Sequence, residues 1–244
     1  MDLRFPGECV VCKSPNVALT RRIPTSRKMD VDLFYCMDCE SFFSPFAPVH
    51  FNGPTLNHHR KVFDRNIGFT QTWFSAISSF LDSSPYVVDI GCGIGSLLFG
   101  LREQGIRGVG YDLDREATEF GFKEYHLDLR GEAWTSESNP YTRVDLITCI
   151  MVLEHIPWPR PLLYEIIKGA QKHNCPAYIS VPWFNKDSWK HLHLPVDEKS
   201  PFYDPWIHVT HFSDKGFELA CRGLGITKLK KITSIPWAGY FISP

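Results

Sequence analysis

No apolar run in the 244-residue sequence reaches the roughly 18 residues that a bilayer span needs. The first nine residues, MDLRFPGEC, also contain no apolar stretch of the kind found in signal peptides. The formal net charge is only −1, so bulk electrostatics favours neither nucleic acid nor an acidic membrane surface as a partner. We therefore expect a cytoplasmic protein without a membrane partner, and the charge disfavours a nucleic-acid partner without excluding one.

Internal repeats and low-complexity tracts are absent too, whereas residues that can build a core are plentiful. Hydrophobic residues make up 43% of the chain and charged residues 22%, which is typical of an ordered domain. The length suits one ordinary domain with a small appendage. We expect a four-cysteine unit at 1–48, a helical linker or cap at 49–85 and a main domain at 86–244.

The eight cysteines fall into two groups. Four form CxxC pairs, Cys9 with Cys12 and Cys36 with Cys39, and the other four are scattered singly. Two such pairs presenting four thiolates suit a tetrahedral, structural zinc ion, Zn²⁺, in a zinc-ribbon-like unit. A redox-active dithiol and unpaired core thiols remain alternatives.

From residue 86 onward, short apolar segments alternate with helical patterns. The apolar segments rarely alternate with polar residues, which favours a sheet buried on both faces. The order predicts an α/β fold with a doubly wound, parallel, Rossmann-like sheet. The predicted strands are 86–90, 108–112, 124–129, 144–150, 177–182 and 225–232, and the predicted helices are 97–104, 115–122, 161–173 and 214–222, with a further helix within 55–82.

The stretch VVDIGCGIGSLLFGL, residues 87–101, joins a predicted strand to a helix through three glycines. Gly91, Gly93 and Gly95 let the backbone turn sharply and approach a ligand without a Cβ in the way. A dinucleotide fingerprint, GxGxxG, would need glycine where the sequence has Ser96. A Rossmann-like domain that binds NAD, or binds nothing, stays an alternative on this pattern alone.

Acidic residues follow the next two predicted strands. Asp112, in GVGYDLD, can accept hydrogen bonds from both hydroxyls of a ribose. Asp128, in YHLDL, can accept from an adenine amino group while Leu129 packs on the ring. Together with the glycine turn, these acids indicate an adenosine-containing ligand.

These linked motifs resemble those of the class I S-adenosylmethionine-dependent methyltransferases. VVDIGCGIG looks like their first motif, GVGYDLD like their ribose-binding segment, and VDLITCIMVLEHIPWP like their fourth strand and the loop after it. The resemblance implies S-adenosyl-L-methionine as cofactor, with Asp89 near the methionine amino group and a backbone contact of Ile150 beside the sulfonium. The cofactor-binding residues that it implies are Asp89, Gly91, Cys92, Gly93, Gly95, Asp112, Leu113, Asp128, Leu129 and Ile150.

The cysteine unit followed by this core is similar to the layout of the sugar C-methyltransferases of deoxysugar biosynthesis, and FYCMDCESFF carries that likeness. The chain is shorter than those enzymes, so the comparison supports the two-part layout more than a substrate.

The acceptor side is predicted from two segments. The resemblance places Glu154 and His155, in LEHIPW, toward the cofactor, and the aromatic-rich segment 181–213 has the composition of a lid or acceptor-binding loop. The candidate catalytic residues are His155, Glu154 and His208, with a structural role for His155 as the alternative. The HxH and HxxH spacings also leave a second metal site open at His191, His193, His208 and His211.

We therefore expect a methyltransferase acting on a small-molecule acceptor, such as a sugar, a secondary metabolite or a nucleotide-linked compound. The alternatives are a methyltransferase whose zinc unit docks a protein or RNA, and a non-catalytic scaffold that only binds the cofactor.

Overall fold

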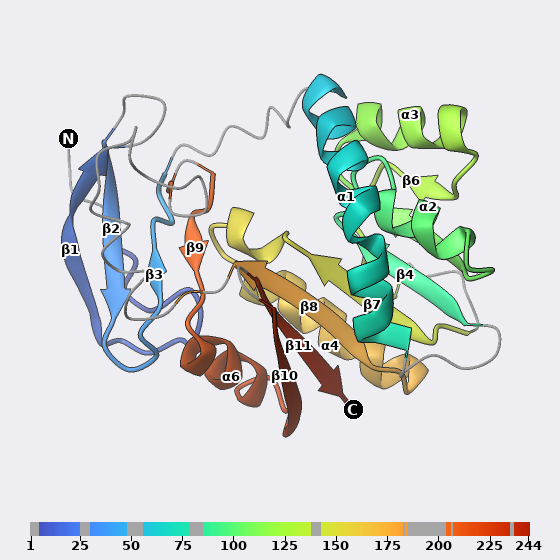
Figure 1. Ribbon diagram of the computed structural model, residues 1–244. Coiled ribbons are helices and arrows are strands. Elements are labelled where there is room, and N and C mark those ends of the chain that lie inside the picture. Colours follow the sequence, from blue (N-terminus) through green and yellow to red (C-terminus); the bar gives the residue numbers. More distant parts are fainter. Residues whose placement is uncertain are drawn as a thin grey trace.

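The computed structural model of the protein contains two β-sheets, and helices cover the larger one (Figure 1). It describes residues 5–24, 30–47, 56–78, 85–137, 143–182, 184, 204–205, 207–234 and 237–244. In chain order the elements are β1 (Val17–Pro24), β2 (Asp30–Cys36), β3 (Phe42–Phe43), α1 (Leu56–Ile77), β4 (Tyr86–Ile90), α2 (Ser96–Arg102), β5 (Arg107–Tyr111), α3 (Arg115–Tyr125), β6 (Leu129–Arg130), β7 (Leu146–Ile150), the 3-10 helix η2 (Leu153–His155), α4 (Arg160–His173), β8 (Ala177–Pro182), β9 (Thr210–His211), α6 (Asp214–Arg222), β10 (Lys228–Ser234) and β11 (Trp237–Ser243).

The larger sheet has seven strands in the order β10-β11-β8-β7-β4-β5-β6. β4 pairs in parallel with β5 on one side and with β7 on the other, so the chain leaves the middle of the sheet in both directions. Parallel pairing continues to β6 and to β8, whereas β11 is antiparallel to both of its neighbours. The carboxyl ends of β4, β5 and β7 therefore meet at a topological switch point, where open α/β sheets bind ligands.

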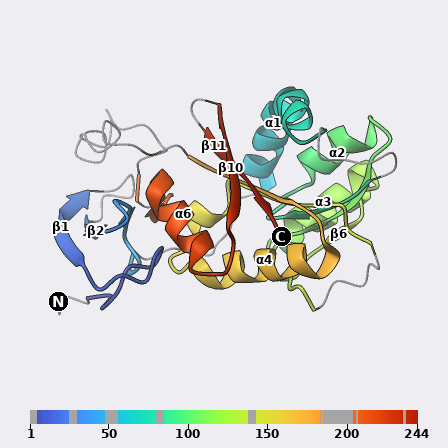
Figure 2. The same ribbon diagram turned by 90° about the horizontal axis from the view of Figure 1, so that it is seen from below.

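Both faces of this sheet are covered, with α1 and α2 on one side and α4 on the other (Figure 2). Within β4, Val87 belongs to the buried cluster that contains Leu98 of α2, while Val88 belongs to the cluster that contains Ile166 of α4. Successive strand residues point to opposite faces, so burial on both sides explains the continuous apolar runs of the sequence.

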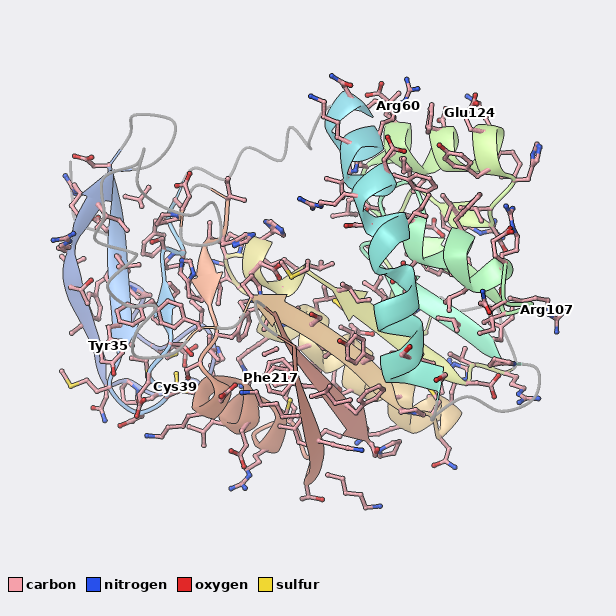
Figure 3. The ribbon with its side chains drawn as sticks, in the orientation of Figure 1. Tyr35, Cys39, Arg60, Arg107, Glu124 and Phe217 are labelled. Atoms are coloured by element: carbon pink, nitrogen blue, oxygen red, sulfur yellow. The ribbon has the colours of Figure 1, made fainter. Side chains whose placement is uncertain are left out.

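The smaller sheet has the order β1-β2-β3-β9 and is antiparallel throughout. Its fourth strand comes from the far end of the chain, where Thr210 pairs with Phe43 and His211 with Phe42. Cys39 and Phe217 of α6 lie at the junction between this sheet and the main domain, and both belong to one buried cluster (Figure 3). The cysteine unit therefore packs directly on the main domain and shares a sheet with it.

Several predicted elements have the predicted form. β4 and β8 have the predicted bounds, and α6 does as well. Side chains cap two helices, since Asp114 accepts a hydrogen bond from the backbone N–H of Ala117 and Ser213 accepts one from Gly216. These elements carry local signals in the sequence, and local geometry satisfies them.

Two expectations about the sheet are corrected. The predicted strand 124–129 is much shorter, because α3 continues to Tyr125 and β6 contains only Leu129–Arg130. The ring of Tyr125 stacks on Phe63 of α1 with 4.5 Å between ring centroids, and this contact holds the last turn of α3. The sheet is also mixed, because the antiparallel strand β11, which the sequence pattern did not predict, is inserted between β8 and β10.

Among the residues that the structure describes, no helix has both the length and the apolar character required to cross a bilayer. Most of the predicted acceptor loop lies outside the described residues, as do His191 and His193.

Candidate functional site

The turn between β4 and α2 has a backbone shape that requires glycine. The φ angle is +74° at Gly91, +55° at Gly93 and +86° at Gly95, all in the left-handed region. A Cβ on Gly91 would lie 2.2 Å from Val152 Cγ2, and a Cβ on Gly95 would lie 2.6 Å from Leu127 Cδ1. The turn therefore lies directly against the loop that follows β7.

Asp112 lies beside this turn at the end of β5. Its carboxylate accepts hydrogen bonds from the backbone N–H groups of Gly93 at 2.8 Å and Asp114 at 2.9 Å. The N–H of Gly91 donates to the carbonyl oxygen of Tyr111 at 2.7 Å, which fixes the turn to the end of β5. Each carboxylate oxygen can accept a further bond, so the half-buried Asp112 can also accept from the hydroxyls of a ribose.

Helix α1 adds a residue that the sequence analysis missed. His59 Nε2 lies 3.0 Å from Asp114 Oδ2, and a Cβ on Gly93 would lie 3.3 Å from His59 Nδ1. His59 therefore covers the glycine turn from the side of α1. Its sequence signal is only a histidine within a helical pattern, which does not indicate where the helix packs.

Asp89 lies in β4, one residue before the strand ends. Its side chain is buried, with 4% of the residue exposed, and it accepts a hydrogen bond from Thr148 Oγ1 at 2.7 Å. Burial raises the pKa of this carboxyl to about 7, while the bond from Thr148 lowers it and the charge of Asp112 raises it. An acid with such a pKa beside a glycine turn is a candidate binding residue for a charged ligand group.

The raised pKa predicts that Asp89 makes the ligand-free protein less stable as the pH rises. Its ordinary pKa is 3.8, so between about pH 4 and about pH 7 the unfolded state releases a proton that the folded state keeps. The free energy of unfolding should therefore fall across this window and then level off. Asp89→Asn removes this fall and should stabilise the protein at about pH 8 by up to about 4 kcal/mol, which corresponds to about three pKa units.

Urea unfolding of the parent protein and Asp89→Asn at about pH 5 and about pH 8 measures this difference. Thr148→Val is the matched control, because it removes the hydrogen bond to Asp89 and keeps the carboxyl group. A stability gain of Asp89→Asn that is equal at the two pH values would show that Asp89 does not titrate in this window.

Two further predicted cofactor residues adjoin the turn. Cys92 is buried, and a Cβ on Gly110 of β5 would lie 2.6 Å from its Sγ, so the thiol fills the space over β5. Burial raises the pKa of this thiol. Leu113 directly follows Asp112 and is 64% exposed, which leaves an apolar surface open beside the carboxylate.

The other predicted residues come from neighbouring strands. Leu129 packs beneath the turn, where a Cβ on Gly95 would lie 3.2 Å from its Cδ2. Ile150 ends β7, is half-buried and pairs with Ser180 of β8. Both residues therefore line the surroundings of the turn.

The structure does not bring Asp128 to the same level as Asp112. Arg130 pairs with Tyr111, so Gly131 is the residue level with Asp112, and Asp128 lies about 10 Å further back along the strand direction. The exposed carboxylate of Asp128 lies 3.1 Å from Arg130 Nη2. The end of β6 presents Gly131 at the rim of the switch point, which the sequence analysis did not identify.

The three predicted catalytic residues lie together in what we call the acceptor-side cluster, Glu154, His155 and His208. One ligand-type atom from each lies within 4.8 Å of the other two. His155 Nδ1 donates to the carbonyl oxygen of Ile207 at 2.7 Å, so its Nε2 is left as an acceptor, 3.9 Å from Glu154 Oε1. Burial lowers the pKa of His155, and the bond to Ile207 raises it. The rings of His155 and His208 meet edge to face with centroids 4.7 Å apart.

Glu154 is the most unusual member of this cluster. It is 1% exposed, and neither carboxylate oxygen has a hydrogen-bond partner among the described residues. Burial raises the pKa of this carboxyl to about 8. Val152, two residues earlier, lies against Gly91, so the cluster adjoins the glycine turn. A buried, unpaired carboxyl group carries a large desolvation cost, and functional sites are where such groups are found.

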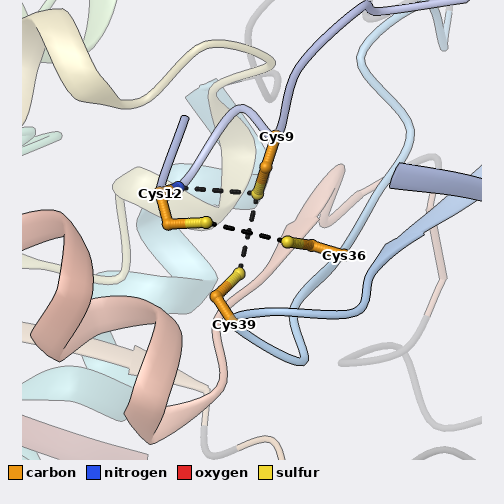
Figure 4. Close-up of side chains that lie close together, drawn as sticks. All are labelled: Cys9, Cys12, Cys36 and Cys39. Carbon is orange, nitrogen blue, oxygen red and sulfur yellow. Dashed lines mark hydrogen bonds between the residues drawn. The ribbon is translucent and has the colours of Figure 1, made fainter. Parts of the chain in front are cut away.

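The four predicted metal ligands converge on one point (Figure 4). Cys9 Sγ lies 3.6 Å from Cys39 Sγ, Cys12 Sγ lies 3.6 Å from Cys36 Sγ, and none of them forms a disulfide. Four sulfurs bound tetrahedrally at about 2.3 Å from one zinc ion are about 3.8 Å apart. Hydrogen bonds from Cys39 and Cys9 lower the pKa of Cys36 to about 2, whereas the hydrogen bond with Cys36 and burial raise the pKa of Cys9 and of Cys39. The cluster fits a zinc ion in both geometry and chemistry.

Comparisons with known proteins agree with this architecture. Residues 57–230, most of the chain, match a family model described as a methyltransferase domain. Ubiquinone biosynthesis O-methyltransferase of Vibrio cholerae is 33% identical over 90 residues, which are 34% of this chain and 36% of that protein. The chain therefore spans only about a third of the length of the curated relatives that it matches.

Solved structures show the same fold at low identity. The plantazolicin methyltransferase BpumL in complex with SAH has a TM-score of 0.57 and 16% identity, with 79% of this chain and 91% of that chain covered. A SAM-dependent methyltransferase from Archaeoglobus fulgidus has a TM-score of 0.56 and 16% identity, with 78% of this chain and 100% of that chain covered. The chain therefore belongs to the methyltransferase domain family, and its fold is that of methyltransferases that use S-adenosylmethionine.

Proposed function

We propose that the protein transfers the methyl group of S-adenosylmethionine to a small-molecule acceptor. The observation that carries the proposal is the arrangement at the switch point of the sheet. There the glycine turn and Asp112 adjoin each other, and Val152 links the turn to the acceptor-side cluster. A donor site and a polar acceptor site thus lie within one stretch of the sheet edge.

On the donor side, the backbone of Gly91–Gly95 would contact the amino-acid part of the donor, with Asp89 near its amino group. Asp112 would accept from the ribose hydroxyls, and Leu113 offers an apolar surface for the adenine. Ile150, at the end of β7, would place a backbone group beside the sulfonium. The position of Asp128 favours Gly131 over Asp128 as the residue at the adenine edge.

On the acceptor side, the protein has to align a nucleophile with the methyl group, because the sulfonium already activates that methyl. Positioning reacting atoms about 3 Å apart and excluding water provides much of the rate enhancement. A base is needed only if the nucleophile must lose a proton. His155 is the candidate for that role, because the carbonyl of Ile207 fixes its ring and leaves Nε2 as the proton acceptor.

Two observations support a small acceptor. The near-neutral chain offers no overall charge that would attract RNA. The relatives named above include a ubiquinone biosynthesis enzyme and a plantazolicin methyltransferase, whose names refer to small molecules or natural products. We propose zinc in the four-cysteine cluster as a structural ion, since four thiolate ligands leave no open position for catalysis.

Methyl transfer from isotope-labelled S-adenosylmethionine to fractionated cell extract tests the function. We expect label in the small-molecule fraction, and His155→Ala should lower this incorporation at least about 100-fold while donor binding stays intact. His126→Asn is the matched control, because His126 is exposed and its φ of 55° suits asparagine. Label in protein or RNA would overturn the acceptor class, and no label in any fraction would favour a binding scaffold.

A further inference from the structure

We propose that Glu154, His155 and His208 bind a divalent transition-metal ion, which in turn holds the oxygen atoms of the acceptor. The catalytic role of this site rests on the proposed methyl transfer, whereas the existence of the metal site can be tested without it. The site is separate from the four-cysteine cluster and has a different set of donor atoms.

The donor atoms match a known class of metal site. Two imidazoles and one carboxylate come from two separate segments, η2 and the chain just before β9, and converge within 4.8 Å. Sets of two histidines and one carboxylate bind zinc or iron and leave positions open for water or substrate. The four cysteines, by contrast, form a closed thiolate set.

The orientation of His155 fits metal binding. Metal-binding histidines commonly donate their second ring N–H to a carbonyl or carboxylate, which fixes the ring and its tautomer. His155 Nδ1 makes that bond to the carbonyl oxygen of Ile207 at 2.7 Å. The lone pair of Nε2 then lies 3.9 Å from Glu154 Oε1, which is too long for a hydrogen bond and leaves a gap that a cation bound to both atoms would bridge.

The second and independent observation is the unpaired carboxyl of Glu154. The residue is 1% exposed, and both of its oxygens are without a hydrogen-bond partner among the described residues. A carboxylate buried in this way is stabilised when it coordinates a metal ion. One carboxylate and two neutral imidazoles would leave a bound divalent ion with a net charge of about +1, which attracts an oxygen anion.

The distances require only small movements. Atoms bound to one metal ion at about 2.1 Å lie at most about 4.2 Å apart, against the 4.8 Å that bounds this cluster. The largest separation would therefore have to shorten by about half an ångström for all three atoms to bind one ion.

The open positions define the class of acceptor. Three protein ligands on a metal ion leave room for two adjacent oxygen atoms of one small molecule, so we expect an acceptor with two neighbouring oxygen donors. Binding to the metal lowers the pKa of a hydroxyl, which releases its proton to solvent. The resulting oxygen then bonds to the methyl carbon as the carbon–sulfur bond breaks. The products are the methyl ether, S-adenosylhomocysteine and one proton. This refines the role given to His155 above: its Nε2 lone pair binds the metal ion, and the ion takes the place of the imidazole in promoting loss of the proton.

Titration of the zinc-filled, 244-residue protein with Co²⁺ tests the site directly. We expect one additional equivalent of Co²⁺ with weak visible d–d absorption and without the intense thiolate band that exchange into the cysteine cluster would produce. Glu154→Gln and His208→Ala should each weaken Co²⁺ binding by more than about 100-fold. Loss of a residue that only hydrogen-bonds a metal ligand typically weakens binding by about 10- to 100-fold, so the larger effect identifies a direct ligand. Glu137→Gln, on the surface beside Lys168, is the matched control and should bind Co²⁺ as the parent does.

Two outcomes would overturn the proposal. One is the absence of a second Co²⁺ equivalent in the parent protein, and the other is unchanged binding in both Glu154→Gln and His208→Ala. The acceptor class is tested by adding 1,2-dihydroxybenzene or phenol to the Co²⁺-loaded protein. We expect only the diol to shift the d–d bands, and an equal response to both would overturn the two-oxygen acceptor. Titration with S-adenosylhomocysteine in the same samples reports donor binding, so a failure of the metal site is distinguishable from a failure of the methyltransferase function.

Discussion

Replacing Asp112 by alanine is expected to weaken binding of S-adenosylmethionine about 30- to 700-fold, or about 2–4 kcal/mol. The carboxylate lies at the end of β5 and already orders the turn by accepting from the N–H of Gly93 at 2.8 Å. In the proposed complex it also accepts from the ribose hydroxyls, and hydrogen bonds to a charged group contribute about 1.5–3 kcal/mol each. Alanine removes both the direct contacts and the ordering of the turn.

Calorimetric titration with S-adenosylhomocysteine measures this effect. Asp128→Ala is the matched control, because its exposed carboxylate pairs with Arg130 and lies away from the rim. We expect it to change the affinity by less than about threefold, as for other surface ion pairs. Thermal melting of both variants should show that they stay folded. Equal affinities for the parent protein and Asp112→Ala would refute the role of Asp112 and, with it, the proposed donor site.

The contrast between these two acids shows what a sequence can and cannot place. Asp112 directly follows a strand that the local pattern identifies, and the glycine turn is contiguous with its own strand. The position of Asp128 relative to the sheet edge depends on where β6 begins. The start of β6 depends in turn on the end of α3, which continues to Tyr125, where the ring contacts Phe63 of α1. Long-range packing thus overrides local strand preference, moves the strand later in the chain and brings Gly131 to the rim.

The same distinction explains the elements that the sequence did not reveal. β9 consists of only Thr210–His211, and it is a strand because Phe42 and Phe43 pair with it from the other end of the chain. The antiparallel β11 follows β10 without an intervening helix, so the alternation of strands and helices that predicts the parallel strands does not predict it. By comparison, α4 spans Arg160–His173, close to the predicted range 161–173, because its apolar periodicity is visible within the helix itself.

For the site, the predicted acceptor residues Glu154, His155 and His208 are brought together by the fold. Glu154 and His155 are adjacent in the sequence, whereas His208 comes from a distant segment. That segment is held by the pairing of β9 with β3 of the N-terminal sheet and by the hydrogen bond from Thr210 Oγ1 to the carbonyl oxygen of Ile156. The carbonyl of Ile207 that orients His155 has no side-chain signal at all. The sequence therefore indicates the residue types of the site, and tertiary pairing supplies their geometry.

This dependence on the N-terminal sheet leads to the second large effect that we expect, from loss of the four-cysteine metal site. Ser213 Oγ donates to the carbonyl oxygen of Cys39, and Ser213 N donates to Ser41 Oγ at 3.2 Å, so the second cysteine pair is bonded to the start of α6. The N–H of Ser44 donates to the carbonyl oxygen of Val209 at 2.8 Å, next to His208. The cysteine unit is thus hydrogen-bonded to the segment that contains His208, one of the three residues of the acceptor-side cluster.

Cys39→Ser is therefore expected to remove the bound zinc and to lower the melting temperature by more than about 10 °C, since a structural zinc ion contributes several kcal/mol or more to folding. Below that temperature, methyl transfer should fall much further than affinity for S-adenosylhomocysteine, because the donor contacts come from β4 and β5 while His208 depends on the cysteine unit. Metal analysis, thermal melting and calorimetry together measure these effects.

Cys175→Ala is the matched control, because it removes a buried thiol outside the cluster and should keep the zinc. Less than about half an equivalent of zinc in the parent protein, purified without chelators, would contradict the metal site. Loss of zinc with unchanged turnover would show instead that β3 and β9 hold His208 in place without the metal ion.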